Sequence, residues 1–246
     1  MSVGQGDCTL LRTGNANVLV DVGPSSEKFD AGERMVLPEL RRRGVDHIDA
    51  ILLTHPDLDH VGGLGAVRRR FPNAKIWTSA EFENDKKLAD ILIQAKVDKG
   101  DIVWLPERGE IDFGSWQATF WCPPVEAGTT NDNLGSVMMR VTTPAGAVVL
   151  TGDAPEDVER RALATGLPWE GDVLKAGHHG SATSSCATWL GAVGPTWVVF
   201  SAGRGNRYGH PSQKTLKRVE ELGAKSIRTD QSGTIQFKIG GQNLNQ

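Results

Sequence analysis

The chain has 246 residues, a net charge of −3 and a sequence pI of about 6.1. Its hydrophobic content of 39% and charged content of 23% are ordinary for a globular protein. No apolar run approaches the ~18 residues that span a bilayer, and no signal-peptide pattern follows Met1. The weakly acidic balance differs from the strongly basic one of a tight nucleic-acid binder, although carboxylates of a metal site themselves add negative charge.

Cysteine use excludes two further classes. Cys8, Cys122 and Cys186 lie far apart and form no C-x-x-C pair, so neither a disulfide framework nor a cysteine-zinc module is expected. We interpret all three as buried thiols. The chain enters its first predicted strand within a few residues of Met1, and we therefore expect a domain cut from a longer protein.

The first half of the chain alternates between strand and helix patterns. It opens with a predicted hairpin that turns at Gly14-Asn15, and its first helix is ended by Gly44. In chain order we predict strands at 8–11 and 18–22, a helix at 32–43, a strand at 47–53, a helix at 64–70, a strand at 75–77, a helix at 81–95, and strands at 102–105, 111–113 and 118–122.

The second half continues the alternation and closes with a predicted hairpin that turns at 231–233. We predict strands at 136–141 and 147–150, a helix at 155–164, a strand at 173–176, a helix near 184–193, a strand at 197–201, a helix at 211–222, and final strands at 226–229 and 234–238. Alternating elements imply sheets covered by helices, in which polar groups just beyond strand ends are functional. We predict one domain over 1–246, with two halves that meet near residues 123–132.

Residues 54–63, Thr-His-Pro-Asp-Leu-Asp-His-Val-Gly-Gly, hold the densest group of candidate ligands. They follow the apolar segment 51–53, so the end of a buried strand holds the side chains rigidly. The candidate ligands are His55, Asp57, Asp59 and His60. Packed this closely, they would repel one another or lack partners without a cation, so the motif predicts half of a metal site.

Three more motifs place polar groups at strand ends. Asp153 ends the apolar run 148–150, the pair His178-His179 follows the predicted strand 173–176, and His210 precedes a helix. Five of the six histidines thus lie at strand-to-helix junctions, and only His47 is expected to be structural. Because neighbours at a strand end point to opposite sides, we expect only one of His178 and His179 to face the metal.

These motifs resemble the metallo-β-lactamase superfamily. His-x-Asp-x-Asp-His is similar to the superfamily's His-x-His-x-Asp-His motif, with Asp57 replacing a histidine, and Asp21 and Asp153 match its strand-end carboxylates. The resemblance is closest to the C-terminal domain of ComEC-type competence proteins, which form a DNA-internalisation channel. It is carried from Val3 to Lys238 by VGQGDC, THPDLDHVGG, NDN, LTGD, KAGHHGS and NRYGHP. It implies an α/β fold, an αββα sandwich, with two divalent metal ions.

The resemblance also implies a ligand set. His55 and Asp57 are expected to bind one metal and Asp59 and His60 the other, while Asp153 bridges both. His179 completes the second site and His178 faces substrate, unless the two exchange roles. Where relatives supply a further histidine, this chain has Asn131-Asp132-Asn133, and because Asn is a weak ligand the first site is expected to be open or loosely held. Asp21 is expected to orient the ligand loop rather than bind metal.

The chemistry of such a site fits phosphodiester hydrolysis. The carboxylate at position 57 favours manganese, with zinc or magnesium as alternatives. We expect catalytic roles for Asp59, His178 and His210, and contacts to phosphate from Ser181, Asn206, Arg207 and His210.

The implied function is a DNA nuclease that degrades one strand of incoming DNA during natural transformation. Its partners would be DNA, single-stranded in our expectation, and the membrane-channel domains of a parent protein. The domain would lie outside the cytoplasm without binding lipid itself. Two alternatives stay open: a small-molecule phosphodiesterase or esterase of the same fold, and a catalytically degenerate DNA-binding domain. β-Lactam hydrolysis is disfavoured by Asp57 and the His-His-Gly-Ser motif.

Overall fold

The computed structural model describes residues 1–13 and 16–239. The first half of the chain builds a five-stranded sheet in the order β1-β2-β5-β6-β7. β1 and β2 are antiparallel, and the other neighbours are parallel. The strands are β1 (Thr9–Thr13), β2 (Ala16–Val20), β5 (Ala50–Leu52), β6 (Lys75–Ser79) and β7 (Ile102–Leu105).

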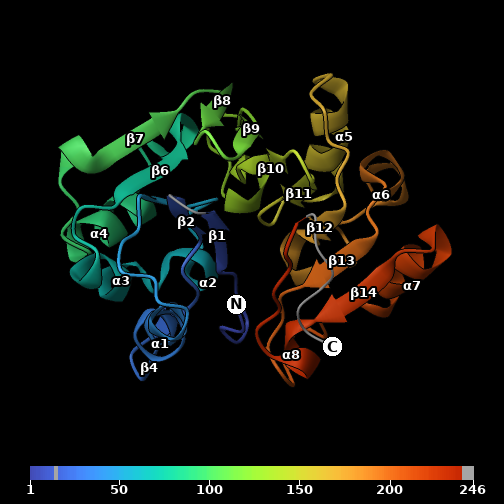
Figure 1. Ribbon diagram of the computed structural model, residues 1–246. Helices are drawn as coiled ribbons and strands as arrows, with labels where there is room; N and C mark the ends of the chain where they lie inside the picture. Colours follow the sequence, from blue (N-terminus) through green and yellow to red (C-terminus); the bar gives the residue numbers. More distant parts are fainter. Residues whose placement is uncertain (14–15, 240–246) are drawn as a thin grey trace.

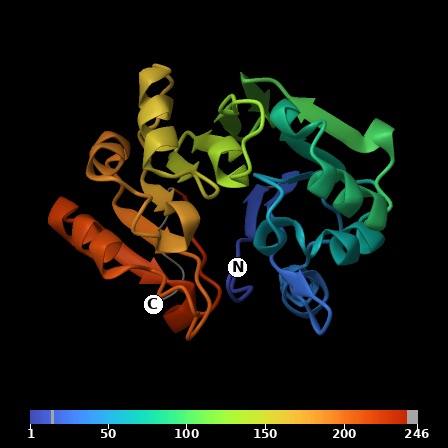
Figure 2. The same cartoon turned by 180° about the vertical axis from the view of Figure 1, so that it is seen from behind.

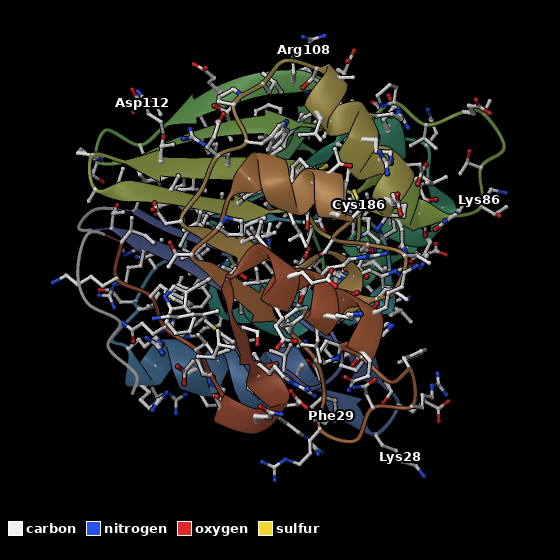
Figure 3. All side chains as sticks on the ribbon, turned by 90° about the vertical axis from the view of Figure 1, so that its right-hand side faces the viewer. Lys28, Phe29, Lys86, Arg108, Asp112 and Cys186 are labelled. Atoms are coloured by element: carbon white, nitrogen blue, oxygen red, sulfur yellow. The ribbon has the colours of Figure 1, made fainter. Side chains whose placement is uncertain are left out.

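The second half builds a seven-stranded sheet in the order β14-β13-β12-β11-β10-β9-β8. It is antiparallel from β8 to β11 and parallel from β11 to β14. Arg108 and Asp112, the two ends of its edge strand β8, are labelled in Figure 3. The strands are β8 (Arg108–Asp112), β9 (Gln117–Trp121), β10 (Met138–Thr143), β11 (Gly146–Leu150), β12 (Val173–Lys175), β13 (Trp197–Phe200) and β14 (Lys225–Arg228); a two-stranded pair, β3 (Ser25–Ser26) and β4 (Phe29–Asp30), stands apart.

Helices cover the outer face of each sheet. In Figure 1 the helices α3 and α4 lie on one side of the molecule and α5, α6 and α7 on the other, and Figure 2 shows the same order from behind. The helices are α1 (Leu37–Arg42), α2 (Leu58–Val61), α3 (Leu64–Arg70), α4 (Lys86–Gln94), α5 (Glu156–Ala164), α6 (Ala187–Val193), α7 (Gln213–Leu222) and α8 (Thr229–Ser232), with shorter turns η1 (Gly32–Val36), η2 (Ala80–Phe82), η3 (Lys99–Asp101), η4 (Asp132–Gly135) and η5 (Gly177–Gly180).

Three apolar clusters join the four layers. One packs the first sheet against its helices, with Ile51 and Leu64 among its members, and another packs the second sheet against α5–α7 around Trp189. The third lies between the sheets and includes Leu52 and Phe120. A sheet buried on both faces favours apolar residues, and every residue of β2 is buried, all of them apolar except Asn17. The predicted αββα sandwich is confirmed.

Several boundaries differ from the sequence-based expectations. The chain passes from the first sheet to the second between Leu105 and Arg108, rather than near 123–132. The predicted helix at 32–43 is observed as one continuous helix, in which the π-helical segment η1 leads directly into α1. The predicted helix at 81–95 is divided into η2 and α4; Asp85 accepts a hydrogen bond from the Leu88 amide (2.7 Å) and so caps the start of α4. The predicted turn at Gly14-Asn15 lies outside the described residues.

The predicted C-terminal hairpin is wrong. β14 pairs in parallel with β13, and the chain then enters α8 at Thr229. The Thr229 hydroxyl accepts a hydrogen bond from the Ala202 amide and donates to the Ala202 carbonyl, both at 2.9 Å. These contacts with the distant residue Ala202 hold Thr229 at the start of α8. The local sequence does not encode such contacts, so the hairpin prediction could not include them. Among the described residues, no helix is long and apolar enough to cross a bilayer.

Candidate metal centre

The predicted ligands converge from loops at the carboxyl ends of strands in both sheets. The loop after β5 carries His55 and His60, the loop after β11 carries Asp153, and η5, after β12, carries His178 and His179. Because parallel strands end at the same edge of a sheet, Asp153 and the histidine pair are neighbours although 24 residues or more separate them in sequence.

The centre of the site is a buried group of two imidazoles and two carboxylates. Ligand atoms of Asp7, His60, Asp153 and His179 all lie within 4.8 Å of one another. His60 Nε2 is 3.2 Å from one carboxylate oxygen of Asp153, and His179 Nε2 is 3.4 Å from the other. Asp153 therefore lies between the two imidazoles, where a single cation could meet all three residues.

Asp21 orients His60 through the ring nitrogen that faces away from the cluster, Nδ1. Its carboxylate accepts hydrogen bonds from His60 Nδ1 (2.8 Å), from the Thr54 hydroxyl (2.8 Å) and from the Thr54 amide (2.9 Å). With a proton on Nδ1, the His60 Nε2 atom faces the cluster as an acceptor. Burial disfavours a charged imidazole, but Asp153 and Asp21 outweigh this effect and raise the pKa of His60 well above its usual value.

His179 and His178 differ in their environment. His179 is buried, donates from Nδ1 to the Ser201 carbonyl (3.0 Å) and directs Nε2 toward Asp59 Oδ2 (3.2 Å). His178 keeps 32% of its side chain exposed, and its Nε2 is 3.8 Å from Asp153 Oδ2. Both residues have left-handed backbones, with φ of 46° and 55°. The strand has already ended at Lys175, so the alternation expected of a strand end does not apply to them.

The other predicted ligands lie toward the rim. His55 is buried, and its Nε2 is 3.5 Å from Asp57 Oδ2. Asp57 also forms an ion pair with Lys87, which lies 3.0 Å from Asp132 as well. The neighbouring His55 imidazole, together with the Lys87 ammonium, outweighs partial burial and holds the pKa of Asp57 well below its usual range. A cation bound by His55 and Asp57 would therefore compete with the Lys87 ammonium.

The Asn131–Asn133 segment adjoins His178. Asn131 accepts a hydrogen bond from the Asn133 amide (3.3 Å) at the start of η4, and Asn133 Nδ2 is 3.5 Å from His178 Nδ1. Asn133 is thus the member of this segment that contacts a candidate catalytic histidine.

Sequence reasoning missed two charged residues of the site, Asp7 and Lys175. The buried Lys175 ammonium forms an ion pair with Asp7, donates to the Gly152 carbonyl (2.9 Å) and lies 3.6 Å from Asp153 Oδ1. Burial would lower the pKa of Lys175, but the carboxylates of Asp7 and Asp153 more than offset it and raise that pKa. The sequence does contain an indication of Lys175, because it is a single charged residue at the end of an otherwise apolar strand.

Gly6 explains how Asp7 reaches the site. Its φ is +146°, and a Cβ atom built on it would lie 2.2 Å from the Asp59 carbonyl oxygen. The following amide, of Asp7, donates to that same carbonyl (3.1 Å). The N-terminal loop therefore packs its backbone directly against the ligand loop, and a larger residue at position 6 would separate them.

The donor set fits divalent metal. Within the described residues, four buried atoms of the candidate ligands make no hydrogen bond: His55 Nε2, His60 Nε2, Asp7 Oδ1 and Asp153 Oδ1. Beside the cluster, Asn133 Oδ1 and His210 Nδ1 also make none. Leaving a buried polar group without a partner costs ~1–3 kcal/mol, and a cation among these acceptors would remove that cost. Imidazole and carboxylate together suit zinc, manganese or iron.

The predicted phosphate-binding residues lie in two loops beside the cluster. The ring of His210 is 5.5 Å from that of His178 and 6.2 Å from that of His179. Burial, with the charges of these two histidines, lowers the pKa of His210 to about 4, so its imidazole is neutral at neutral pH. The Ser181 hydroxyl lies 3.0 Å from that of Thr183.

Asn206 and Arg207 differ in how freely they can reach a ligand. The Asn206 amide group donates to the carbonyls of Gly203 (3.0 Å) and His210 (2.6 Å) and accepts from the His210 amide (3.0 Å). These bonds favour a role in holding the loop. Arg207 is exposed and donates only to the Tyr208 hydroxyl (2.9 Å) among the described side-chain contacts.

Comparison with known proteins agrees with this architecture. Residues 1–196 match the family described as the metallo-beta-lactamase superfamily. ComE operon protein 3 of Bacillus subtilis (strain 168) is 29% identical over 97% of the chain, and competence protein ComA of Neisseria gonorrhoeae is 33% identical over 96%. The chain spans 32% and 31% of those proteins, about a third of their length.

A solved structure shares the fold. The metallo-beta-lactamase fold protein YhfI from Bacillus subtilis superimposes with a TM-score of 0.58 at 14% identity, over 91% of this chain and 88% of that one. The chain belongs to the metallo-β-lactamase superfamily, and homologues that match nearly all of it include ComEC-type competence proteins.

Proposed function

We propose that this domain is a metal-dependent nuclease that hydrolyses phosphodiester bonds of DNA and degrades one strand of incoming DNA during natural transformation. One observation carries the proposal: a buried cluster of imidazoles and carboxylates with unpaired acceptor atoms, in a chain whose homologues are competence proteins. A hydrolytic site of this kind, in a protein of DNA uptake, has DNA as its natural substrate.

The proposal assigns two divalent ions, with manganese favoured. His60, Asp59 and His179 would hold one ion, His55 and Asp57 the other, and Asp153 both. When bound, such a pair supplies a polarised phosphate and a water of lowered pKa. The chain's own contribution is to fix these ligands: Asp21 holds His60 and the Ser201 carbonyl holds His179. Asp7 is a further ligand candidate, restrained by Lys175.

Three residues around the cluster would handle the substrate. His178 is near Asp153 and still half-exposed, so it can donate a proton to the leaving oxygen or hold a phosphate oxygen. His210, neutral and next to His178, can share that proton. Arg207 has an exposed guanidinium that can pair with a phosphate along the strand.

We also propose where this activity takes place. Because the chain spans only about a third of its competence relatives, we propose that it works beside membrane-channel domains of a parent protein, on the extracytoplasmic side. DNA entering as a duplex would lose one strand here while the other enters the channel.

The test is cleavage of labelled single- and double-stranded DNA by the purified chain with manganese, magnesium, zinc or chelator. We expect cleavage only with divalent metal and fastest with manganese. Faster cleavage with zinc would overturn the metal assignment alone. Hydrolysis of a small phosphodiester such as bis(p-nitrophenyl) phosphate without cleavage of DNA would favour the small-molecule alternative. Metal-independent DNA binding without any hydrolysis would favour the alternative of a catalytically degenerate DNA-binding domain.

A further inference from the structure

Tyr208 is an exposed aromatic residue beside the candidate metal centre. It is the one tyrosine of the chain. Its exposed fraction is 56%, and the other large hydrophobic side chains that are exposed among the described residues are all aliphatic or Met. An exposed aromatic ring next to such a site offers a surface on which a base can stack.

A row of rings connects Tyr208 to the metal ligands. Tyr208 stacks on His210, with ring centroids 5.8 Å apart and an interplanar angle of 24°. His210 in turn contacts His178 at 5.5 Å and His179 at 6.2 Å. Two ring-to-ring contacts therefore connect Tyr208 to the candidate ligand His179.

The loop that carries Tyr208 is held in shape before any ligand arrives. The three hydrogen bonds of the Asn206 side chain close the loop from Gly203 to His210. The Gly203 amide also donates to the side chain of Gln5 (3.2 Å), which ties the loop to the N-terminal segment. Binding on Tyr208 thus costs little ordering of the backbone.

Arg207 adds a positive charge to the same surface. Its guanidinium carbon lies over the Tyr208 ring, 5.0 Å from the ring centre, and its Nη2 donates to the Tyr208 hydroxyl (2.9 Å). A flat aromatic ring in contact with an exposed guanidinium matches the two parts of a nucleotide, because the ring can stack a base in place of the guanidinium and the cation can pair with a phosphate.

We propose that Tyr208 and Arg207 form a base-stacking platform that holds an unpaired nucleotide next to the phosphate to be cleaved. This proposal rests on the proposed nuclease function and deepens it. A base can lie on the platform only when it has left its duplex, so the platform gives the site a preference for single-stranded DNA. Every base has a π-face, so the preference would be for strandedness rather than for sequence.

Binding can be tested separately from cleavage because the chain has one tyrosine. Incorporating 3-fluorotyrosine gives a single ¹⁹F signal, from position 208. In metal-free protein with chelator, we expect this signal to shift on titration with a short oligothymidylate. An abasic sugar-phosphate oligomer of the same length carries the same charge without bases, and it should produce little shift. Equal shifts with both oligomers would overturn base stacking.

Kinetics give a second test. Tyr208→Ala should lower kcat/KM for manganese-supported cleavage of single-stranded DNA by ~5- to 150-fold, chiefly through KM, the range expected for loss of one stacked base. Tyr208→Trp should restore most of it, because the larger ring also stacks. Ile93→Ala, at an exposed site in α4, is the control that should leave cleavage unchanged.

The outcomes separate the platform from the nuclease. Wild-type cleavage with an unaffected Tyr208→Ala variant would contradict the platform and leave the nuclease standing. No cleavage by any variant, with a ¹⁹F shift specific to the base-bearing oligomer, would reject the nuclease and retain nucleobase binding. An equal loss in Tyr208→Ala and Tyr208→Trp would assign the residue a role in loop structure and reject stacking.

Discussion

At the residue scale, the paired histidines have different environments and therefore different expected roles. His179 is buried, with both ring nitrogens engaged, whereas His178 is half-exposed. We predict that His179→Ala lowers metal content, while His178→Ala keeps the metal and lowers turnover by ~100- to 10,000-fold, the usual contribution of a general acid. Metal analysis and single-turnover cleavage of both variants measure the two effects. If His178→Ala loses the metal and His179→Ala retains it, the roles are reversed.

Lys175 provides a second residue-scale prediction. Replacing it by Met leaves the buried Asp7 carboxylate without its ammonium partner. Breaking a buried ion pair costs ~3–5 kcal/mol, so Lys175→Met should lower the unfolding free energy of the metal-free protein by about that amount. Saturating manganese should recover much of the loss, because a bound cation neutralises Asp7 in place of the ammonium. Urea unfolding with and without manganese measures both effects.

The matched control is Lys217→Met. Lys217 is 74% exposed and lies 3.7 Å from Glu221, and such a surface pair contributes ~1 kcal/mol or less. A similar loss in both lysine variants, or a loss in Lys175→Met that manganese does not change, would contradict the role given to the Asp7–Lys175 pair.

At the element scale, α5 supports the loop that carries the histidine pair. The buried Glu159 carboxylate accepts hydrogen bonds from the amides of Ser185 (2.6 Å) and Cys186 (2.9 Å). The Ser185 hydroxyl accepts one from the Gly177 amide (3.3 Å), at the start of η5. A helix of the outer layer is thereby linked to the backbone next to His178.

Burial of Glu159 gives a pH-dependent stability. Burial raises its pKa from 4.5 to about 7, against the opposing hydrogen bonds of the two amides. The folded state then binds the proton more tightly than the unfolded state. The contribution of this group to the free energy of unfolding is therefore complete below pH 4.5 and is lost as pH rises through about 7. The free energy of unfolding falls by up to ~3 kcal/mol over this range.

We predict that the unfolding free energy of wild type falls relative to Glu159→Gln across this pH range, because glutamine does not titrate. Urea unfolding from pH 4.5 to 8 gives the difference at each pH. Ile93→Ala, at an exposed position without a titrating group, should show a difference that is constant with pH. A constant difference for Glu159→Gln as well would mean that Glu159 does not change protonation in this range.

Most elements could be predicted because their local patterns and their burial agree. The runs 148–150 and 173–175 are apolar or buried throughout, as strands covered on both faces must be. Element ends were less predictable, because side-chain caps such as Asp85 fix them. The C-terminal hairpin was mispredicted because pairing with β13 and the contacts of Thr229 with Ala202 are tertiary.

At the scale of the whole molecule, the site exists only where the two halves meet. His60 and Asp21 come from the first half, Asp153 and His179 from the second. Motifs at strand ends identified these residues one by one. Asp7 and Lys175 were missed because their pairing joins the N-terminal loop to a strand of the other sheet, and no local spacing reports such a contact.

The four-layer architecture also explains why one carboxylate should matter most. Asp153 lies between His60 and His179, and its loss would affect every cation that the cluster holds. Asp153→Asn keeps the shape of the side chain and removes its charge. The variant therefore tests the metal centre with little change to packing.

The most direct test of the account is manganese-dependent cleavage of an end-labelled single-stranded oligonucleotide by wild type and Asp153→Asn, with metal content measured on the same samples. We predict that wild type binds manganese and cleaves, that chelator stops cleavage, and that Asp153→Asn loses both metal and more than ~100-fold in rate, beyond the 10- to 100-fold typical of a group that only supports a ligand. Cleavage that continues in excess chelator, or an Asp153→Asn variant that cleaves at the wild-type rate, would contradict a metal-dependent nuclease centred on Asp153.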